Sequence, residues 1–110
     1  MIALKEPVAQ TELTDAAAFY DRERPGLGDR FIEEFERVVA LLNDNPELGR
    51  AIGDNRRSIV FDRFPFRLIY SLEDSVIRII AICHQKRRPD YWRGRVEEPR
   101  PEYAVLQQAA

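Results

Sequence analysis

Cysteine and histidine each occur once in the 110-residue chain, and they are adjacent, as Cys83 and His84. A single cysteine excludes an internal disulfide framework and a multi-cysteine zinc site, and a single histidine excludes a histidine-rich metal site. Neighbouring side chains on a strand point to opposite faces, so this pair is not a nucleophile with its base. We therefore interpret Cys83 as a small buried apolar group, and we predict neither a metal nor another cofactor.

Long apolar runs are also missing. No stretch approaches the ~20 residues that cross a bilayer, and the apolar residues 1–4 are followed at once by charge, so there is no signal-peptide core. Gly26 and Gly28 lie between two expected helices and not after a strand, which excludes a phosphate-binding loop. These absences predict a cytoplasmic protein that makes no membrane contact.

The chain does contain enough apolar surface for a folded domain. Hydrophobic residues make up 45% of it and aromatic residues 10%. That composition excludes a wholly disordered chain, which lacks the apolar surface needed to offset chain entropy. A length of 110 residues is typical of one domain that buries a real core.

The net charge of −2 hides an asymmetry along the chain. Residues 1–49 carry 5 basic and 11 acidic side chains, residues 50–95 carry 11 basic and 5 acidic, and residues 96–110 carry 1 basic and 3 acidic. The positive charge is therefore concentrated in the second half of the chain. Such a segment predicts an anionic partner, either a nucleic acid or an acidic protein.

The first half predicts two amphipathic helices joined by a short turn. Apolar residues recur at helical spacing between residues 8 and 24, after a proline that suits a helix N-terminus. A Pro-Gly break at 24–28 precedes a second helix that ends near residues 43–46. The two apolar stripes comprise Leu13, Ala16, Ala17 and Tyr20 in the first helix, and Phe31, Phe35, Val38, Val39 and Leu42 in the second. The short link predicts an antiparallel hairpin.

Acidic residues of these helices lie off the apolar stripes. We therefore expect Glu12 on the first helix to be solvated. On the second helix Glu33, Glu34 and Glu36 predict a solvated face and not an acid–base pair, with Glu33 placed to pair with Arg37 one turn later.

The second half changes to strand periodicity. Apolar and polar residues alternate over 57–62 and over 66–72, and residues 76–83 are almost continuously apolar, which is typical of a central strand covered on both faces. Residues 1–4 are compatible with a short N-terminal edge strand. The predicted fold class is α+β, with an N-terminal antiparallel helical hairpin packed on a small antiparallel sheet that is a β-meander.

Basic side chains gather on and after these strands. If Phe66 and Leu68 face the helices, Arg67 and Ile69 lie on the open face. Residues 84–95 then carry five basic residues and two aromatics, which can neutralise phosphate and stack on bases. The alternative is a solubilising basic loop with its tryptophan packed on the sheet edge. The candidate target-binding residues are Arg56, Arg57, Arg63, Arg67, Lys86, Arg87, Arg88, Tyr91 and Trp92.

Three segments in this order resemble the RelE/ParE superfamily of bacterial type II toxins, over roughly residues 7–95. They are Tyr20…Arg24-Pro25-Gly26-Leu27-Gly28-Asp29-Arg30-Phe31 with Asn45-Pro46-Glu47-Leu48-Gly49-Arg50, then Arg56-Arg57 leading into Phe64-Pro65-Phe66-Arg67-Leu68-Ile69-Tyr70, then Ile82-Cys83-His84-Gln85-Lys86-Arg87-Arg88-Pro89-Asp90-Tyr91-Trp92. The resemblance implies a single toxin domain over residues 1–95, a C-terminal tail over 96–110, and a cognate antitoxin protein that neutralises the toxin.

The resemblance also implies two alternative targets. ParE-like members inhibit DNA gyrase, whereas RelE-like members cleave mRNA on the ribosome. Two lysines on the first meander strand of the RelE-like nucleases are matched here by Ser58 and Val60. The Pro-Gly-Leu-Gly turn, the Asn-Pro-Glu-Leu-Gly segment and the Arg56-Arg57 pair are more ParE-like, so we favour gyrase as the target.

The RelE-like alternative has its own candidate residues. Arg67, Lys86 and Arg87 would stabilise charge on the phosphate, and His84 or Tyr91 would transfer protons. A third alternative is a folded member of the superfamily that is not toxic. In either toxin, Ile69 and its arginine neighbours would suit an acidic amphipathic antitoxin helix.

Overall fold

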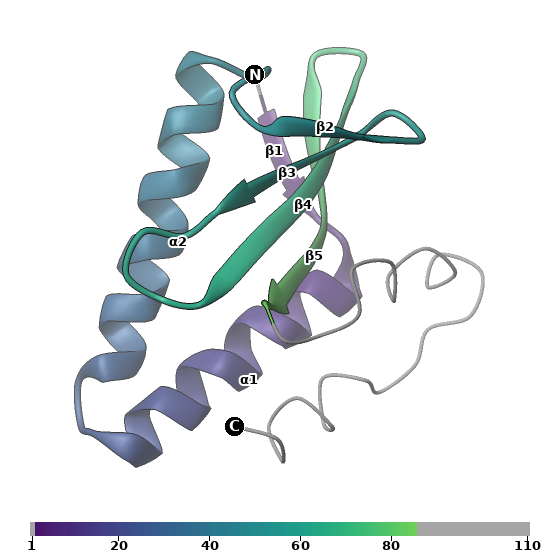
Figure 1. Cartoon of the computed structure of the whole chain (residues 1–110). Helices are drawn as coiled ribbons and strands as arrows, with labels where there is room; N and C mark the ends of the chain where they lie inside the picture. Colours follow the sequence, from purple (N-terminus) through teal and green to yellow (C-terminus); the bar gives the residue numbers. More distant parts are fainter. Residues whose placement is uncertain (1, 86–110) are drawn as a thin grey trace.

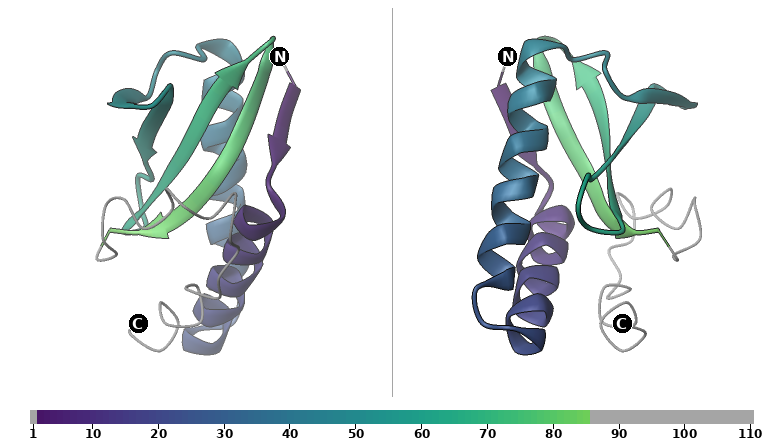
Figure 2. Two further views of the ribbon diagram at one scale, coloured as in Figure 1. Left: turned by 90° about the vertical axis from the view of Figure 1, so that its right-hand side faces the viewer. Right: turned by 60° about the vertical axis from the view of Figure 1, so that its left-hand side comes forward.

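Two helices and five strands make up the part of the chain that a computed structural model describes, residues 2–85. In chain order they are β1 (Ile2–Lys5), α1 (Pro7–Glu23), α2 (Leu27–Asp44), β2 (Arg50–Gly53), β3 (Arg56–Val60), β4 (Phe66–Glu73) and β5 (Val76–His84). The strands form one sheet in the order β1-β5-β4-β3-β2. Both helices lie on the same side of this sheet (Figure 1; Figure 2), which confirms the predicted α+β fold class.

The two helices form the expected hairpin, and their close approach depends on glycine. Gly26 has a φ of 90°, in the left-handed region that favours glycine, immediately before α2. The Gly28 N–H donates to the Asp21 carboxylate at 2.7 Å. A Cβ at Gly28 would collide with the Ala17 carbonyl oxygen of α1. The Pro-Gly-Leu-Gly link therefore sets how tightly the second helix packs on the first.

The sheet contains the predicted antiparallel meander, β3-β4-β5, extended by one strand on each side. β1 is the N-terminal edge strand and pairs with β5 in parallel, so the sheet as a whole is mixed. β2, which the sequence pattern did not indicate, pairs antiparallel with β3. Asp54 and Asn55 link them with φ values of 52° and 58°, as a two-residue turn of the type common in hairpins requires.

An extra residue in β5 explains why this strand is apolar almost throughout. The pairing register with β4 shifts between Ile69 and Tyr70, which leaves Ile80 of β5 without a partner as a β-bulge. As a result Ile79 and Ile82 both belong to the core beneath the helices. Ile80, Ala81 and Cys83 belong to a second buried cluster. β5 is therefore apolar on both faces, as expected for a central strand.

The main core lies between the helices and the sheet. Phe66, Leu68 and Tyr70 of β4 pack there against the apolar stripes of α1 and α2, as the alternation predicted. The Tyr70 hydroxyl donates to the Pro46 carbonyl oxygen at 2.8 Å and accepts from the Gly49 N–H at 2.9 Å. One core side chain therefore also fixes the loop between α2 and β2.

Two helical glutamates that were expected in solvent are buried, and that interpretation was wrong. Glu12 of α1 is 1% exposed, and its carboxylate accepts from the Ile82 N–H of β5 at 2.9 Å. β1 ends where Lys5 pairs with Ile79, so it has no carbonyl oxygen that could accept from the Ile82 N–H further along β5. The Glu12 carboxylate accepts from this N–H instead. Glu34 of α2, 7% exposed, accepts from a backbone N–H of the β3–β4 loop.

Candidate functional site

The sheet face opposite the helices, which we call the outer face, carries the central arginine of the sequence motif. Cross-strand partners point to the same face. Arg67 of β4 pairs with Val60 of β3 on one side and with Cys83 of β5 on the other. Ile69, the next outward residue of β4, pairs with Ser58 and is 1% exposed. Ile69 itself therefore offers a partner almost no apolar surface, in contrast to the expectation for an antitoxin helix.

Arg56 lies at the other end of the outer face. It pairs with Ser71 and stands four residues before Val60, which is about 13 Å along a strand. Its Nε is buried and has no hydrogen-bond partner in the described structure. Its charge adds to the hydrogen bonds from Ser71 and Arg78 that hold the pKa of the Glu73 carboxyl below its usual range. Arg56 and Arg67 therefore lie well apart on the outer face, which also carries Arg50, the partner of Ser58, and Arg78, the partner of Ser71.

Arg57 points the opposite way and holds a loop. It pairs with Tyr70 on the helix side of the sheet. Its guanidinium donates to the carbonyl oxygens of Glu47 at 3.1 Å and Gly49 at 2.7 Å. The Arg56-Arg57 pair of the sequence motif is therefore divided between the two sides, and Arg56 alone of the two reaches the outer face.

Arg63 lies in the β3–β4 loop, beside α2. The loop and the helix line an open groove of about 900 Å³, which we call the α2 groove. Tyr20, Leu27, Phe64 and Pro65 form its apolar lining, and its charged lining comes from α2 and from the loop. Sequence reasoning placed Arg63 with the other strand arginines, but it faces this groove.

Glu34 fixes one wall of the α2 groove. Its carboxylate accepts from Arg37 Nη2 at 2.8 Å and Nε at 3.3 Å, and from the Asp62 N–H. The hydrogen bond from Arg37 is the largest reason why the pKa of Glu34 lies below its usual range, and the N–H groups of Asp62 and Arg63 lower it further although burial raises it. The predicted partner of Arg37, Glu33, is exposed instead.

His84 and Arg67 lie on opposite faces of the sheet. His84 pairs with Phe66, and the two rings meet edge to face with centroids 5.2 Å apart. Arg67, the next residue of β4, points to the outer face. The structure therefore does not bring these two candidate residues together. The remaining candidates lie outside the described residues: Lys86, Arg87, Arg88, Tyr91 and Trp92.

Comparison with known proteins adds the family. A family model for the ParE toxin of the type II toxin-antitoxin system parDE matches residues 5–89, a span that includes everything from α1 to β5. The chain belongs to this family of ParE toxins. The match confirms the superfamily resemblance and its ParE-like branch, and a toxin of this family implies an antitoxin as its partner. No curated protein matches the chain.

Two kinds of site are absent from the described part of the toxin, residues 2–85. Within residues 2–85, no helix is both long enough and apolar enough to cross a membrane. The same stretch of the toxin places no group of three or more His, Cys, Asp or Glu side chains where they could hold a metal ion.

The α2 groove was missed by sequence reasoning. The periodicity of α2 assigns Glu33 to a solvated face, and nothing local to the helix reveals a neighbour there. The available signal was Phe64-Pro65, two apolar residues between strands that need a surface to pack on. Which surface they reach depends on the fold of the whole toxin.

Proposed function

We propose that this ParE-family toxin inhibits DNA gyrase by binding it, with no chemical step of its own. The observation that carries the proposal is the environment of Arg67. Its cross-strand neighbours are Val60 and Cys83, and His84 lies on the other face. RNA cleavage requires a base, an acid and charge stabilisation in one place, so the surroundings of Arg67 within residues 2–85 support a binding surface better than a nuclease site.

The positions that match the nuclease lysines support the same proposal. Ser58 is 7% exposed and Val60 is 56% exposed on the outer face. A large exposed valine beside Arg67 resembles the mixture of apolar and arginine groups found at protein interfaces.

Arg56 is the second contact that we propose for gyrase. A buried guanidinium nitrogen without an acceptor is unfavourable, so Arg56 would gain by turning its guanidinium group outward to a carboxylate or carbonyl of a bound protein. Arginine is enriched among the interface residues that dominate binding energy, because its planar group binds carboxylates through two parallel hydrogen bonds.

A supercoiling assay with purified gyrase and purified toxin tests the proposal. We expect excess toxin to abolish supercoiling. Arg67→Ala should raise the half-inhibitory concentration at least about tenfold, the effect of losing an important interface arginine. Arg22→Ala is the matched control, because Arg22 is an exposed arginine in the last turn of α1; it should change inhibition by less than about twofold.

Full supercoiling in the presence of excess toxin would contradict the proposal. A parallel assay for ribosome-dependent mRNA cleavage tests the RelE-like alternative, in which His84→Ala and Tyr91→Phe should both slow the reaction strongly. If the toxin inhibits gyrase but Arg67→Ala and Arg22→Ala raise the half-inhibitory concentration equally, gyrase remains the target. The proposed contact through Arg67 would then be wrong.

A further inference from the structure

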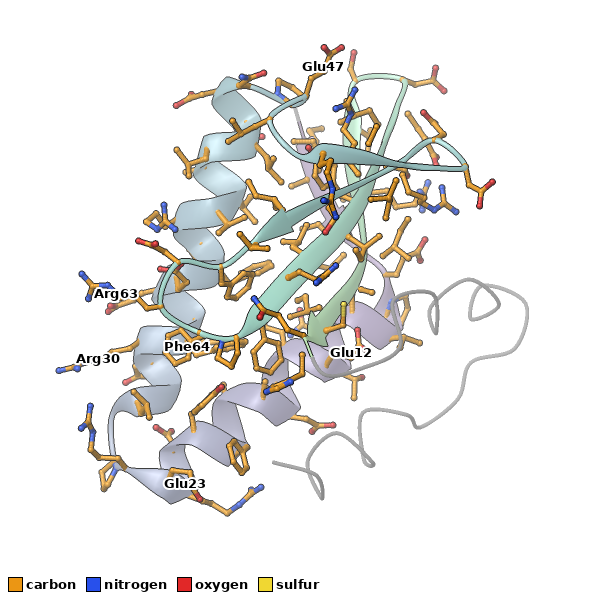
Figure 3. The ribbon with its side chains drawn as sticks, in the orientation of Figure 1. Glu12, Glu23, Arg30, Glu47, Arg63 and Phe64 are labelled. Atoms are coloured by element: carbon orange, nitrogen blue, oxygen red, sulfur yellow. The ribbon has the colours of Figure 1, made fainter. Side chains whose placement is uncertain are left out.

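The α2 groove lies apart from the outer face that we propose for gyrase. Figure 3 shows Arg30, from α2, and Arg63, from the β3–β4 loop, pointing outward on the same side of the molecule, with Phe64 beside them. The groove is open and measures about 900 Å³. That volume is large enough for a short stretch of another polypeptide.

The floor of the groove is aromatic and held in place. The Phe64 ring is partly exposed and lies 4.9 Å from the Tyr20 ring and 5.1 Å from the Phe31 ring, centroid to centroid. Backbone hydrogen bonds close the loop, from the Phe66 N–H to the Phe64 carbonyl at 2.7 Å and from the Phe61 N–H to the Phe66 carbonyl at 2.9 Å. An apolar side chain can therefore bind against Phe64 without first ordering the loop.

The charges around the groove are not equivalent. Arg37 is engaged by the Glu34 carboxylate at 2.8 Å and by the charge of Asp62. Arg30 and Arg63, in contrast, form no ion pair with any of residues 2–85. Two cations that have no ion-pair partner among residues 2–85 therefore lie beside the aromatic floor.

We propose that the α2 groove binds an acidic segment of the cognate antitoxin, with an apolar side chain against Phe64 and a carboxylate between Arg30 and Arg63. The proposal rests on the toxin-antitoxin family and does not depend on gyrase as the target. Guanidinium groups bind carboxylates through paired hydrogen bonds, which are the strongest kind. Exposed Glu33 and Asp62 also line the groove, so the segment carries its acid between the two arginines and neutral or basic residues toward Glu33 and Asp62.

The probe for this site is the antitoxin encoded in the reading frame next to that of the toxin. Its affinity for the intact toxin is measured by calorimetry. Arg30→Glu and Arg63→Glu should each weaken binding at least about tenfold, because each replaces attraction of a carboxylate by repulsion. Arg22→Glu makes the same change of charge outside the groove and should alter affinity by less than about twofold.

Two further measurements separate a local contact from other causes. Arg30 lies near the N-terminus of α2, where an acidic residue is favourable, so Arg30→Glu should keep the melting temperature of the toxin. The difference between Arg30→Glu and the unmodified toxin should shrink as salt is raised toward about 1 M, where screening acts within ~3 Å. Phe64→Leu keeps an apolar group in the loop and should weaken antitoxin binding by about three- to tenfold through loss of the ring.

Affinities within about twofold of the unmodified toxin for both Arg30→Glu and Arg63→Glu would overturn the proposal. An equal loss in Arg22→Glu would also overturn it, since it would reveal a response to net charge alone. A variant that loses gyrase inhibition yet keeps antitoxin affinity would assign the groove to the target instead. A toxin that fails to inhibit gyrase leaves all of these affinities measurable, so the two proposals fail independently.

Discussion

The Glu34 carboxylate should stabilise the toxin mainly through the loop and only weakly through its ion pair. Glu34 accepts from Arg37 and from the Asp62 N–H at the start of the β3–β4 loop. Glu34→Ala removes both contacts, and Arg37→Ala removes the first alone. The difference between the two variants therefore measures the contact between the carboxylate and the loop.

The structure sets the expected magnitudes. The Arg37 side chain is 47% exposed, so its ion pair contributes about 0.5–1 kcal/mol at most. A hydrogen bond to a charged group contributes about 1.5–3 kcal/mol, and its loss leaves a backbone N–H without its acceptor. Glu34→Ala should therefore lower the free energy of unfolding by about 2–4 kcal/mol, and Arg37→Ala by about 1 kcal/mol or less.

Urea unfolding followed by circular dichroism measures these differences, if both variants keep the slope of the unmodified toxin. The pH dependence gives a second readout. Because the pKa of Glu34 is lowered in the fold, its ionised form stabilises the toxin fully above its ordinary value of 4.5 and this stabilisation is lost as the pH falls through the lower folded value. The stability difference between the toxin and Glu34→Gln should therefore narrow in acid.

If Glu34→Ala and Arg37→Ala lower the free energy of unfolding equally, the reasoning is refuted. The ion pair would then account for the whole stabilisation by Glu34. A stability difference between the toxin and Glu34→Gln that does not change between neutral and acidic pH would also refute it.

Three further changes test how the fold is held together. Glu12→Ala should lower the free energy of unfolding by about 2–4 kcal/mol, because it leaves the Ile82 N–H buried without its carboxylate; unchanged amide exchange at Ile82 would contradict this. Tyr70→Phe keeps the core ring and removes two hydrogen bonds, so urea unfolding should show a loss of about 1–3 kcal/mol, with a loss near zero as the contrary result. Gly28→Ala should lower the melting temperature although alanine favours helices, since its Cβ would collide with the Ala17 carbonyl; a rise in melting temperature would show that the hairpin relaxes freely.

The helices and the meander could be predicted from sequence because their signals are local. Phe31, Phe35, Val38 and Leu42 mark one face of α2 whatever that face packs on. β2 gave no such signal, since it is four residues long and mostly exposed, with the pattern Arg-Ala-Ile-Gly. Its pairing with β3 depends on the turn at 54–55 and not on alternation.

The buried glutamates could not be predicted from periodicity. A helical pattern marks Glu12 as polar and therefore as exposed, but its burial depends on where a different segment ends. β1 stops where Lys5 pairs with Ile79, and that end point leaves the Ile82 N–H for the carboxylate to accept. The burial of Glu12 therefore depends on how far β1 extends along β5, and the sequence of α1 does not contain this information.

The sequence identified the candidate binding residues, but it did not show which face of the sheet each of them occupies. Arg56 and Arg57 are neighbours in sequence, and a strand necessarily sends neighbours to opposite faces. Which of the two faces outward follows from the pairing of β3 with β4, because a shift by one residue exchanges the faces. Sequence reasoning placed Arg67 correctly on the open face, since the apolar neighbours Phe66 and Leu68 fix the parity of β4.

The two buried glutamates act in equivalent ways at different places in the sheet. Glu12 of α1 binds β5 beyond the end of β1, and Glu34 of α2 binds the loop just beyond the end of β3. Each helix is thereby joined to the sheet by a carboxylate as well as by its apolar stripe. Because the β3–β4 loop carries both Arg63 and Phe64, the geometry of the α2 groove depends on Glu34. It follows that Glu34→Ala should weaken antitoxin binding more than Arg37→Ala does, if the groove is the antitoxin site.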